Sequence, residues 1–147
     1  MKITIDENVV NDDEIIIKCS KLDDRLLNLI SIIQAFNNNI IVNDDGEILK
    51  LDINKILYFE SVDKKIFVYT NQKVYEIFLR LYEIEQKYTS LGFFRASKSF
   101  IVNLDKVISI KPMLGSRLES LLENNEKIIV SRKYVKNLKS MLDDRKD

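Results

Sequence analysis

Residues 93–103 read FFRASKSFIVN, with apolar residues on either side of a basic, hydroxyl-rich centre. In one continuous strand, Lys98 would point to the same side as Phe100 and Val102, which are expected to be buried. Because a buried and unpaired ammonium group is costly, the strand is predicted to break near Ser97 and Lys98 and to present both on a loop. The pattern alone leaves two interpretations open, an anion-binding loop and an ordinary basic turn.

Short strands bounded by turn signals flank this segment on both sides. The expected strands are residues 47–51, 55–60, 66–70, 73–77, 93–96, 99–103, 106–111, 117–122 and 127–130. Apolar residues between 78 and 88 recur at helical spacing and predict one short helix, with Gly92 as its C-terminal cap. A last helix, over residues 131–142, is expected to be capped by Ser131. The predicted fold class is mainly β with short helices, an α+β arrangement of antiparallel hairpins.

Residues 1–42 are predicted to form a small β-β-α segment that ends at the turn signal of residues 43–46. β-branched residues at 3–5 and 15–17 are typical of two strands, and apolar residues from 22 to 36 recur at helical spacing. The apolar stripe of this helix is interpreted either as packing on the chain's own domain or as a dimer or partner surface. The predicted domains are residues 1–42, a main domain at 43–142 and a frayed tail at 143–147.

Charge divides the chain into two unlike parts, although its 23 basic and 23 acidic residues cancel overall. Residues 1–50 hold 5 basic and 10 acidic residues, whereas residues 51–147 hold 18 basic and 13 acidic ones. Within the latter, residues 93–142 hold 10 basic and 4 acidic side chains. An anionic partner is therefore expected to bind the second part of the chain.

The absence of histidine argues against several functions. Without imidazole, the chain lacks a common metal ligand and the side chain most often used as a general acid or base near neutral pH. Its three glycines form no phosphate-binding loop. We therefore predict no enzyme activity, no bound metal and no cofactor. The single Cys19 and the lack of an apolar run near ~20 residues favour a soluble, cytoplasmic protein.

Two clusters combine cations with hydroxyl groups, at residues 95–99 and 131–136. Lys and Arg supply positive charge, while Ser hydroxyls and backbone N–H groups at a helix start supply fixed donors, a mixture that suits phosphate. Arg and Lys also reach guanine acceptors in the major groove, which is one way to read a sequence. The lysines after residue 131 are equally consistent with the solvated face of a terminal helix.

Three blocks of sequence carry a resemblance to a known family. They are ILYFES at residues 56–61, FRASKSFIVN at 94–103 and VSRKYVK at 130–136. In order and spacing they closely resemble the LytTR family of bacterial DNA-binding domains, over about residues 45–142. The resemblance implies an elongated, mostly antiparallel β fold that places loops, rather than a recognition helix, in successive major grooves. It also implies a transcription regulator that acts at paired, direct-repeat-like promoter sites on double-stranded DNA, commonly as a homodimer on DNA.

Carried over to this chain, the family's DNA-binding loops fall in three places: the turn after residues 59–61, the loop before residues 100–103 and the start of the last helix. The implied DNA-binding residues are Lys64 and Lys65, then Arg95, Ser97, Lys98 and Ser99, then Arg132, Lys133 and Lys136. Lysines stand here where some relatives have His or Asn, so the preferred bases do not carry over. Glu60 and Asn103 are expected to support the loops through hydrogen bonds rather than to contact DNA.

Some 42 residues are too few for the receiver domain that commonly precedes this DNA-binding domain. The closer likeness is to compact regulators of the family, often encoded beside a small membrane protein that restrains them, which implies a small membrane-bound inhibitor as a partner. The alternative function is a protein-interaction module that acts through another regulator or this antagonist without contacting DNA. It predicts dispensable basic loops and an active surface on the helix over residues 22–36. RNA binding is less favoured because most Phe and Tyr residues fall at core positions.

Overall fold

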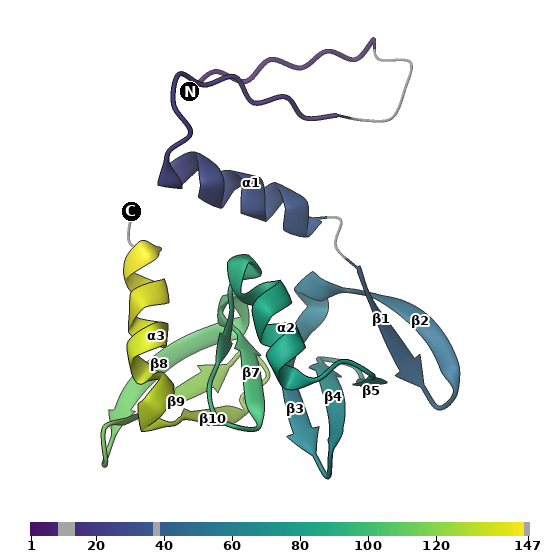
Figure 1. Cartoon of the computed structure of the whole chain (residues 1–147), viewed down its shortest axis with the longest axis vertical. Helices are drawn as coiled ribbons and strands as arrows, with labels where there is room; N and C mark the ends of the chain where they lie inside the picture. Colours follow the sequence, from purple (N-terminus) through teal and green to yellow (C-terminus); the bar gives the residue numbers. More distant parts are fainter. Residues whose placement is uncertain (9–13, 37–38, 146–147) are drawn as a thin grey trace.

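The computed structural model describes residues 1–8, 14–36 and 39–145, which contain two antiparallel sheets (Figure 1). The strand order is β2-β1-β5-β4-β3-β7-β6 in the large sheet and β10-β9-β8 in the small one. The strands of the large sheet are β1 (Asn39–Asp44), β2 (Glu47–Asp52), β3 (Ile56–Val62), β4 (Lys65–Thr70), β5 (Val74–Ile77), β6 (Phe93–Arg95) and β7 (Phe100–Asn103). Those of the small sheet are β8 (Val107–Met113), β9 (Arg117–Leu122) and β10 (Lys127–Val130). The α-helices are α1 (Asp24–Phe36), α2 (Leu81–Tyr88) and α3 (Arg132–Asp144).

The predicted fold class is confirmed. All nine predicted strands are present, each within two residues at either end, because alternating residues supply one buried and one exposed face. The large sheet also contains β1, which the sequence pattern did not separate from the N-terminal segment. The turn signal at residues 43–46 lies in the β1–β2 hairpin, where Asp45 and Gly46 have φ values of 49° and 91°. The predicted boundary after residue 42 therefore falls inside β1, whose Ile40 and Val42 are buried.

The N-terminal β-β-α segment is only partly as predicted. Its helix is present as α1, but the two predicted strands are wrong. Residues 3–5 and 15–17 pair with no described strand, and Figure 1 shows both segments beyond α1, away from the sheets. Ile3, Ile5, Ile15 and Ile16 are exposed, and Ile17 is half-buried. β-branched residues favour a strand only where a neighbouring strand supplies hydrogen bonds and packing.

The helix predicted between residues 78 and 88 is shorter than expected. α2 begins at Leu81, and Phe78 lies in the connection after β5 with 78% of its surface exposed. Gly92, in a left-handed conformation, ends the one-turn helix that follows α2, as predicted for a C-terminal glycine. Helical spacing alone did not show where the helix begins, because Phe78 continues the pattern without joining the core.

The C-terminal helix is longer than expected. α3 continues to Asp144, and Arg145 forms an ion pair with Asp105 at 2.8 Å. Leu138 of α3 is fully buried, which fixes the helix against the small sheet. The tail that was predicted to fray from residue 143 is thus helical to Asp144, while residues 146–147 lie outside the described part of the chain.

Two hydrophobic cores hold these elements together. One lies between the large sheet and α2 and includes Phe59 and Ile101. The other lies between the two sheets and α3 and includes Leu57, Val102 and Leu138. All five side chains are fully buried. Because β3 and β7 contribute to both cores, the turns at their ends are attached to the most buried part of the molecule.

A stacked tyrosine pair joins the two sheets. The ring centroids of Tyr58 and Tyr69 lie 4.3 Å apart. The Tyr58 hydroxyl donates to Glu126, before β10, at 2.6 Å, and the Tyr69 hydroxyl donates to Glu60 at 2.7 Å. Burial, followed by the hydrogen bond to Glu126, raises the pKa of Tyr58 above its ordinary value. Burial and the hydrogen bond to Glu60 raise the pKa of Tyr69 to about 12.

We expect the free energy of unfolding to fall between about pH 10 and pH 12. An unfolded tyrosine ionises near pH ~10, so in this window the native state holds tyrosine protons that the unfolded chain has lost. This stabilisation is complete below about pH 10 and is lost as the pH rises, at up to roughly 1.4 kcal/mol per pH unit for each tyrosine. Urea unfolding of the wild type and Tyr69→Phe across this range measures it. The variant should show a shallower pH slope, and equal slopes would contradict the assignment.

Candidate nucleic-acid interface

The three predicted loops lie next to one another at one end of the molecule. In Figure 1, the β3–β4 turn, the β6–β7 loop and the N-terminus of α3 occupy the end opposite α1 and the chain's N-terminus. The backbone N–H of Ser61 donates to the carbonyl of Ser99 at 2.8 Å, which joins the first segment to the second. The backbone N–H of Ser131 donates to the carbonyl of Ala96, also at 2.8 Å, which joins the second to the third. One continuous surface therefore carries all three.

The β3–β4 turn presents two lysines. Asp63 and Lys64 have φ values of 50° and 68°, and Val62 pairs with Lys65 across the turn. Two-residue turns with positive φ at both central positions match the right-handed twist of the strands that they join. Lys64 and Lys65 are exposed, and neither forms an ion pair with a residue that the structure describes. Both ammonium groups are thus available to an anion.

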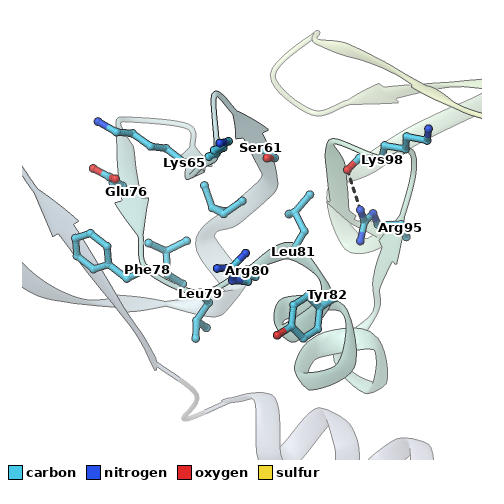
Figure 2. Close-up of a pocket in the computed structure, with 13 residues that line it drawn as sticks. Ser61, Lys65, Glu76, Phe78, Leu79, Arg80, Leu81, Tyr82, Arg95 and Lys98 are labelled. Carbon is cyan, nitrogen blue, oxygen red and sulfur yellow. Dashed lines mark hydrogen bonds between the residues drawn. The ribbon is translucent and has the colours of Figure 1, made fainter.

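The β6–β7 loop is fixed by Arg95. As predicted, the strand is interrupted, since β6 ends at Arg95 and β7 begins at Phe100. Arg95 Nε donates to the carbonyl of Ser97 at 2.6 Å, and Nη2 donates to the carbonyl of Lys98 at 2.8 Å (Figure 2). Nη1 pairs with Glu85 of α2 at 3.2 Å, which leaves the Arg95 side chain 17% exposed. Arg95 therefore shapes the loop, and Lys98 is its exposed cation.

The serines of this loop are also used within the protein. The hydroxyl oxygen of Ser97 accepts the backbone N–H of Ser99 at 3.2 Å, and both residues are half-buried. The carbonyl of Ser99 is the acceptor for Ser61. These bonds give the loop a defined shape without a ligand, so the backbone that carries the Lys98 side chain is held in place.

Ser131 precedes α3 but does not cap it through its side chain, which corrects the prediction. Its hydroxyl donates instead to the carbonyl of Ala96 at 3.3 Å, because the β6–β7 loop packs against the start of the helix. A helix N-terminus without a side-chain cap leaves N–H groups and the positive end of the helix dipole open.

Exposed cations occupy the first two turns of α3. They are Arg132, Lys133 and Lys136. The Tyr134 ring centroid lies 5.5 Å from Lys133 Nζ and 6.0 Å from the guanidinium carbon of Arg95. Cations at a helix N-terminus add to the positive dipole and suit a bound anion such as phosphate. This end of α3 therefore extends the positive surface of the two loops.

The connection between β5 and α2 also belongs to this surface, which the sequence did not predict. An open cleft of about 760 Å³ lies between the β3–β4 turn and the β6–β7 loop (Figure 2). Arg80 and the exposed aromatic residues Phe78 and Tyr82 line it together with several of the predicted residues. No local signal marks Arg80, because it joins the cleft only when three segments that are distant in sequence fold together.

Two polar residues form hydrogen bonds of the kind expected for residues that support the loops, while the absence of a DNA contact stays a prediction. Asn103 is 3% exposed, and it uses both ends of its amide. Nδ2 donates to the carbonyl of Ile56 at 2.9 Å, and Oδ1 accepts the backbone N–H of Asp105 at 3.1 Å. Glu60 accepts the hydrogen bond from Tyr69 that was described above. Both residues thus link the strands that carry the loops.

Other kinds of site are not seen in the part of the chain that the structure describes. Its residues hold no group of three or more metal-binding side chains. None of its helices combines the length and the apolar character needed to cross a membrane. What the surface offers is exposed Lys and Arg side chains on turns held by hydrogen bonds.

A β scaffold whose basic loops meet at one end is typical of a nucleic-acid-binding domain. Residues 46–143 match the family model of the LytTr DNA-binding domain, and the chain therefore belongs to the LytTR family. The resemblance inferred from three short blocks is thus confirmed over most of the chain.

Individual proteins agree with this assignment. The chain is 36% identical over 87 residues to the sensory transduction protein LytT of Enterococcus faecalis, covering 58% of this chain and 36% of that protein. It is 32% identical over 107 residues to the transcriptional regulatory protein YpdB of Escherichia coli, covering 72% and 44%. The chain spans roughly two fifths of the length of these relatives. The LytTr DNA-binding domain of a Bacillus cereus protein shares the fold, with a TM-score of 0.68, 24% identity, and coverage of 72% of this chain and 97% of that one.

Proposed function

We propose that this protein is a sequence-specific transcription regulator that binds double-stranded DNA and reads the major groove through its basic loops. The observation that carries the proposal is that three basic segments, far apart in sequence, share one surface and are joined by hydrogen bonds. Membership of a DNA-binding family supports DNA as the partner. The similarity to a transcriptional regulatory protein supports regulation as the role, in the cytoplasm, where bacterial promoters lie.

The two turns and the start of α3 contact different parts of the DNA, the turns its bases and the helix its phosphates. Lys98, on a loop held by Arg95, is our candidate for base contacts, with Lys64 and Lys65 on the neighbouring turn. The candidate phosphate ligands are Arg132, Lys133 and Lys136. Arg95 and Ser97 act by fixing the loop, since their polar groups already bind within the protein.

Affinity for DNA is expected to fall steeply with salt, because each phosphate contact releases condensed counterions. If about six cations contact phosphates, the slope of log affinity against log salt is roughly −5. Lys136→Ala should weaken all duplexes similarly and make the slope shallower by about 0.9. Fluorescence anisotropy between about 50 and 200 mM KCl measures both quantities. An affinity that does not change with salt would contradict the phosphate contacts.

The proposed function is tested by selecting duplexes from a randomised pool with the purified protein. Gel-shift titrations then compare the selected duplex with a scrambled duplex of the same composition. We expect the selected duplex to bind roughly a thousandfold tighter, as is usual for specific regulators. A pool without enrichment would instead favour the protein-interaction module that acts without DNA contact.

One observation favours a protein contact in addition to DNA binding. Among residues 24–33 of α1, no side chain belongs to either hydrophobic core, and Ile32 is 67% exposed. α1 lies at the end opposite the basic loops, so a partner there leaves the DNA surface open (Figure 1). We propose that a second copy of this chain covers α1 when two copies occupy paired promoter repeats. Sedimentation with duplexes of one and two repeats tests this, and a protein that stays monomeric would leave α1 to a membrane-bound inhibitor.

A further inference from the structure

The cleft between the β3–β4 turn and the β6–β7 loop is lined by residues from different parts of the chain. Figure 2 shows Ser61 and Lys65 on one side, Lys98 and Arg95 on the other, and Arg80 below Ser61 and Lys65, in the lining of the same cleft. Arg80 lies directly before α2, on the connection that follows β5. The cleft has a volume of about 760 Å³ and opens to solvent. An extended polymer can therefore lie across it without the protein opening.

The lining of this cleft is strongly positive. Its basic residues are Lys64, Lys65, Arg80, Arg95 and Lys98, and its one lining carboxylate is Glu76. Arg95 is neutralised by Glu85, whereas the other four form no ion pair with a residue in the described ranges. Glu83, in the first turn of α2, does not line the cleft. Its carboxylate accepts the backbone N–H of Arg80 at 3.3 Å. Several like charges around one open cleft attract an anion.

We propose that this cleft holds the sugar-phosphate backbone of one DNA strand, with Arg80 as a phosphate ligand. The inference rests on the proposed function and adds a contact that lies outside the three loops implied by the family resemblance. A guanidinium group fits phosphate well, because its parallel N–H groups bind two oxygens at once. A phosphate links each pair of successive nucleosides, and Arg80 lines the cleft between the β3–β4 turn and the β6–β7 loop, so a backbone held in this cleft would place a phosphate beside Arg80.

The rim of the cleft suits the sugar part of that backbone. Phe78 and Tyr82 are both exposed and lie on either side of Arg80 in Figure 2. Contact with deoxyribose removes the apolar surface of these rings from water, which is favourable. The rings then also exclude solvent around the phosphate. Aromatic rings beside cations can also stack on the bases of a single strand. The duplex is favoured because the walls are the same turns that carry the candidate base contacts.

The test compares Arg80→Gln with Lys87→Gln in the full chain. Lys87 is exposed near the far end of α2 and does not line the cleft, so its variant removes one charge from the same helix region as a matched control. Fluorescence anisotropy is measured on the selected duplex, the scrambled duplex and single-stranded DNA. Arg80→Gln should lower affinity for both duplexes about fivefold and make the salt slope shallower by about 0.9, while Lys87→Gln should match the wild type.

Phosphate-ethylation interference on the selected duplex separates contact from indirect effects. One phosphate should block the wild type when ethylated and should no longer matter to Arg80→Gln. If Arg80→Gln matches the wild type while both duplexes still bind, the cleft proposal is overturned and the proposed function stands. If the wild type does not discriminate between the duplexes, the proposed function fails instead. A loss confined to single-stranded DNA would also overturn the proposal, because the occupant would then be a single strand.

Discussion

Replacing Lys98 with alanine is expected to lower the affinity for the selected duplex by roughly 5- to 150-fold, the effect of one good base contact. The scrambled duplex should lose about fivefold or less, since only a general charge is removed there. The structural reason is that the loop is already shaped by the two Arg95 bonds to the carbonyls of Ser97 and Lys98. Little order remains to be gained on binding, so the side chain can discriminate among bases.

Two comparisons isolate this effect. Lys98→Arg keeps the positive charge and can still reach guanine, so it should retain much of the preference for the selected duplex. Lys136→Ala, on the exposed side of α3, should reduce affinity for both duplexes to the same extent. Gel-shift titrations of all three variants on both duplexes give the ratios. Equal losses on the two duplexes for Lys98→Ala would refute its role in reading bases.

Much of the scaffold could be predicted from local patterns. The strand break before Phe100 was predicted from Lys98 alone, because its ammonium group cannot lie on a buried strand face without a partner. The alternating strands of the main domain were equally visible, since each buries one face. The N-terminal strands failed for the converse reason. Ile3 and Ile15 have strand propensity but no neighbouring strand. Propensity alone does not stabilise a strand when no other strand supplies hydrogen bonds and packing.

The site was harder to predict because its members act through contacts across the chain. The sequence marked Arg95 as a cation for DNA, but Glu85 and two carbonyls occupy its guanidinium group. Arg80 carried no signal, since the cleft exists only after β5, the β3–β4 turn and the β6–β7 loop meet. Sequence pattern therefore identified which loops are basic, while the fold decides which cations remain free.

Asn103 offers the second large effect, on stability. Asn103→Ala removes the donor to the buried carbonyl of Ile56 and the acceptor for the N–H of Asp105. An unsatisfied buried carbonyl costs about 1–3 kcal/mol. Asn103 is also the N-cap of the one-turn helix Leu104–Lys106, and the loss of this cap adds about 1 kcal/mol, so the free energy of unfolding should fall by roughly 2–4 kcal/mol. Asn71→Ala is the matched control. Its amide donates to Glu123 on the exposed surface, so its loss should cost roughly 1 kcal/mol or less.

Urea unfolding followed by circular dichroism gives the stability of both variants, and DNA titration at a temperature where Asn103→Ala is folded gives its affinity. A support role predicts a large loss of stability with affinity for the selected duplex within a few fold of the wild type. Normal stability with lost affinity would mean that Asn103 touches DNA. The distinction matters because Asn103 ties β7 to the start of β3, and these two strands carry the β6–β7 loop and the β3–β4 turn at their other ends. A rigid link at one end of a strand pair is what keeps two loops in register at the other.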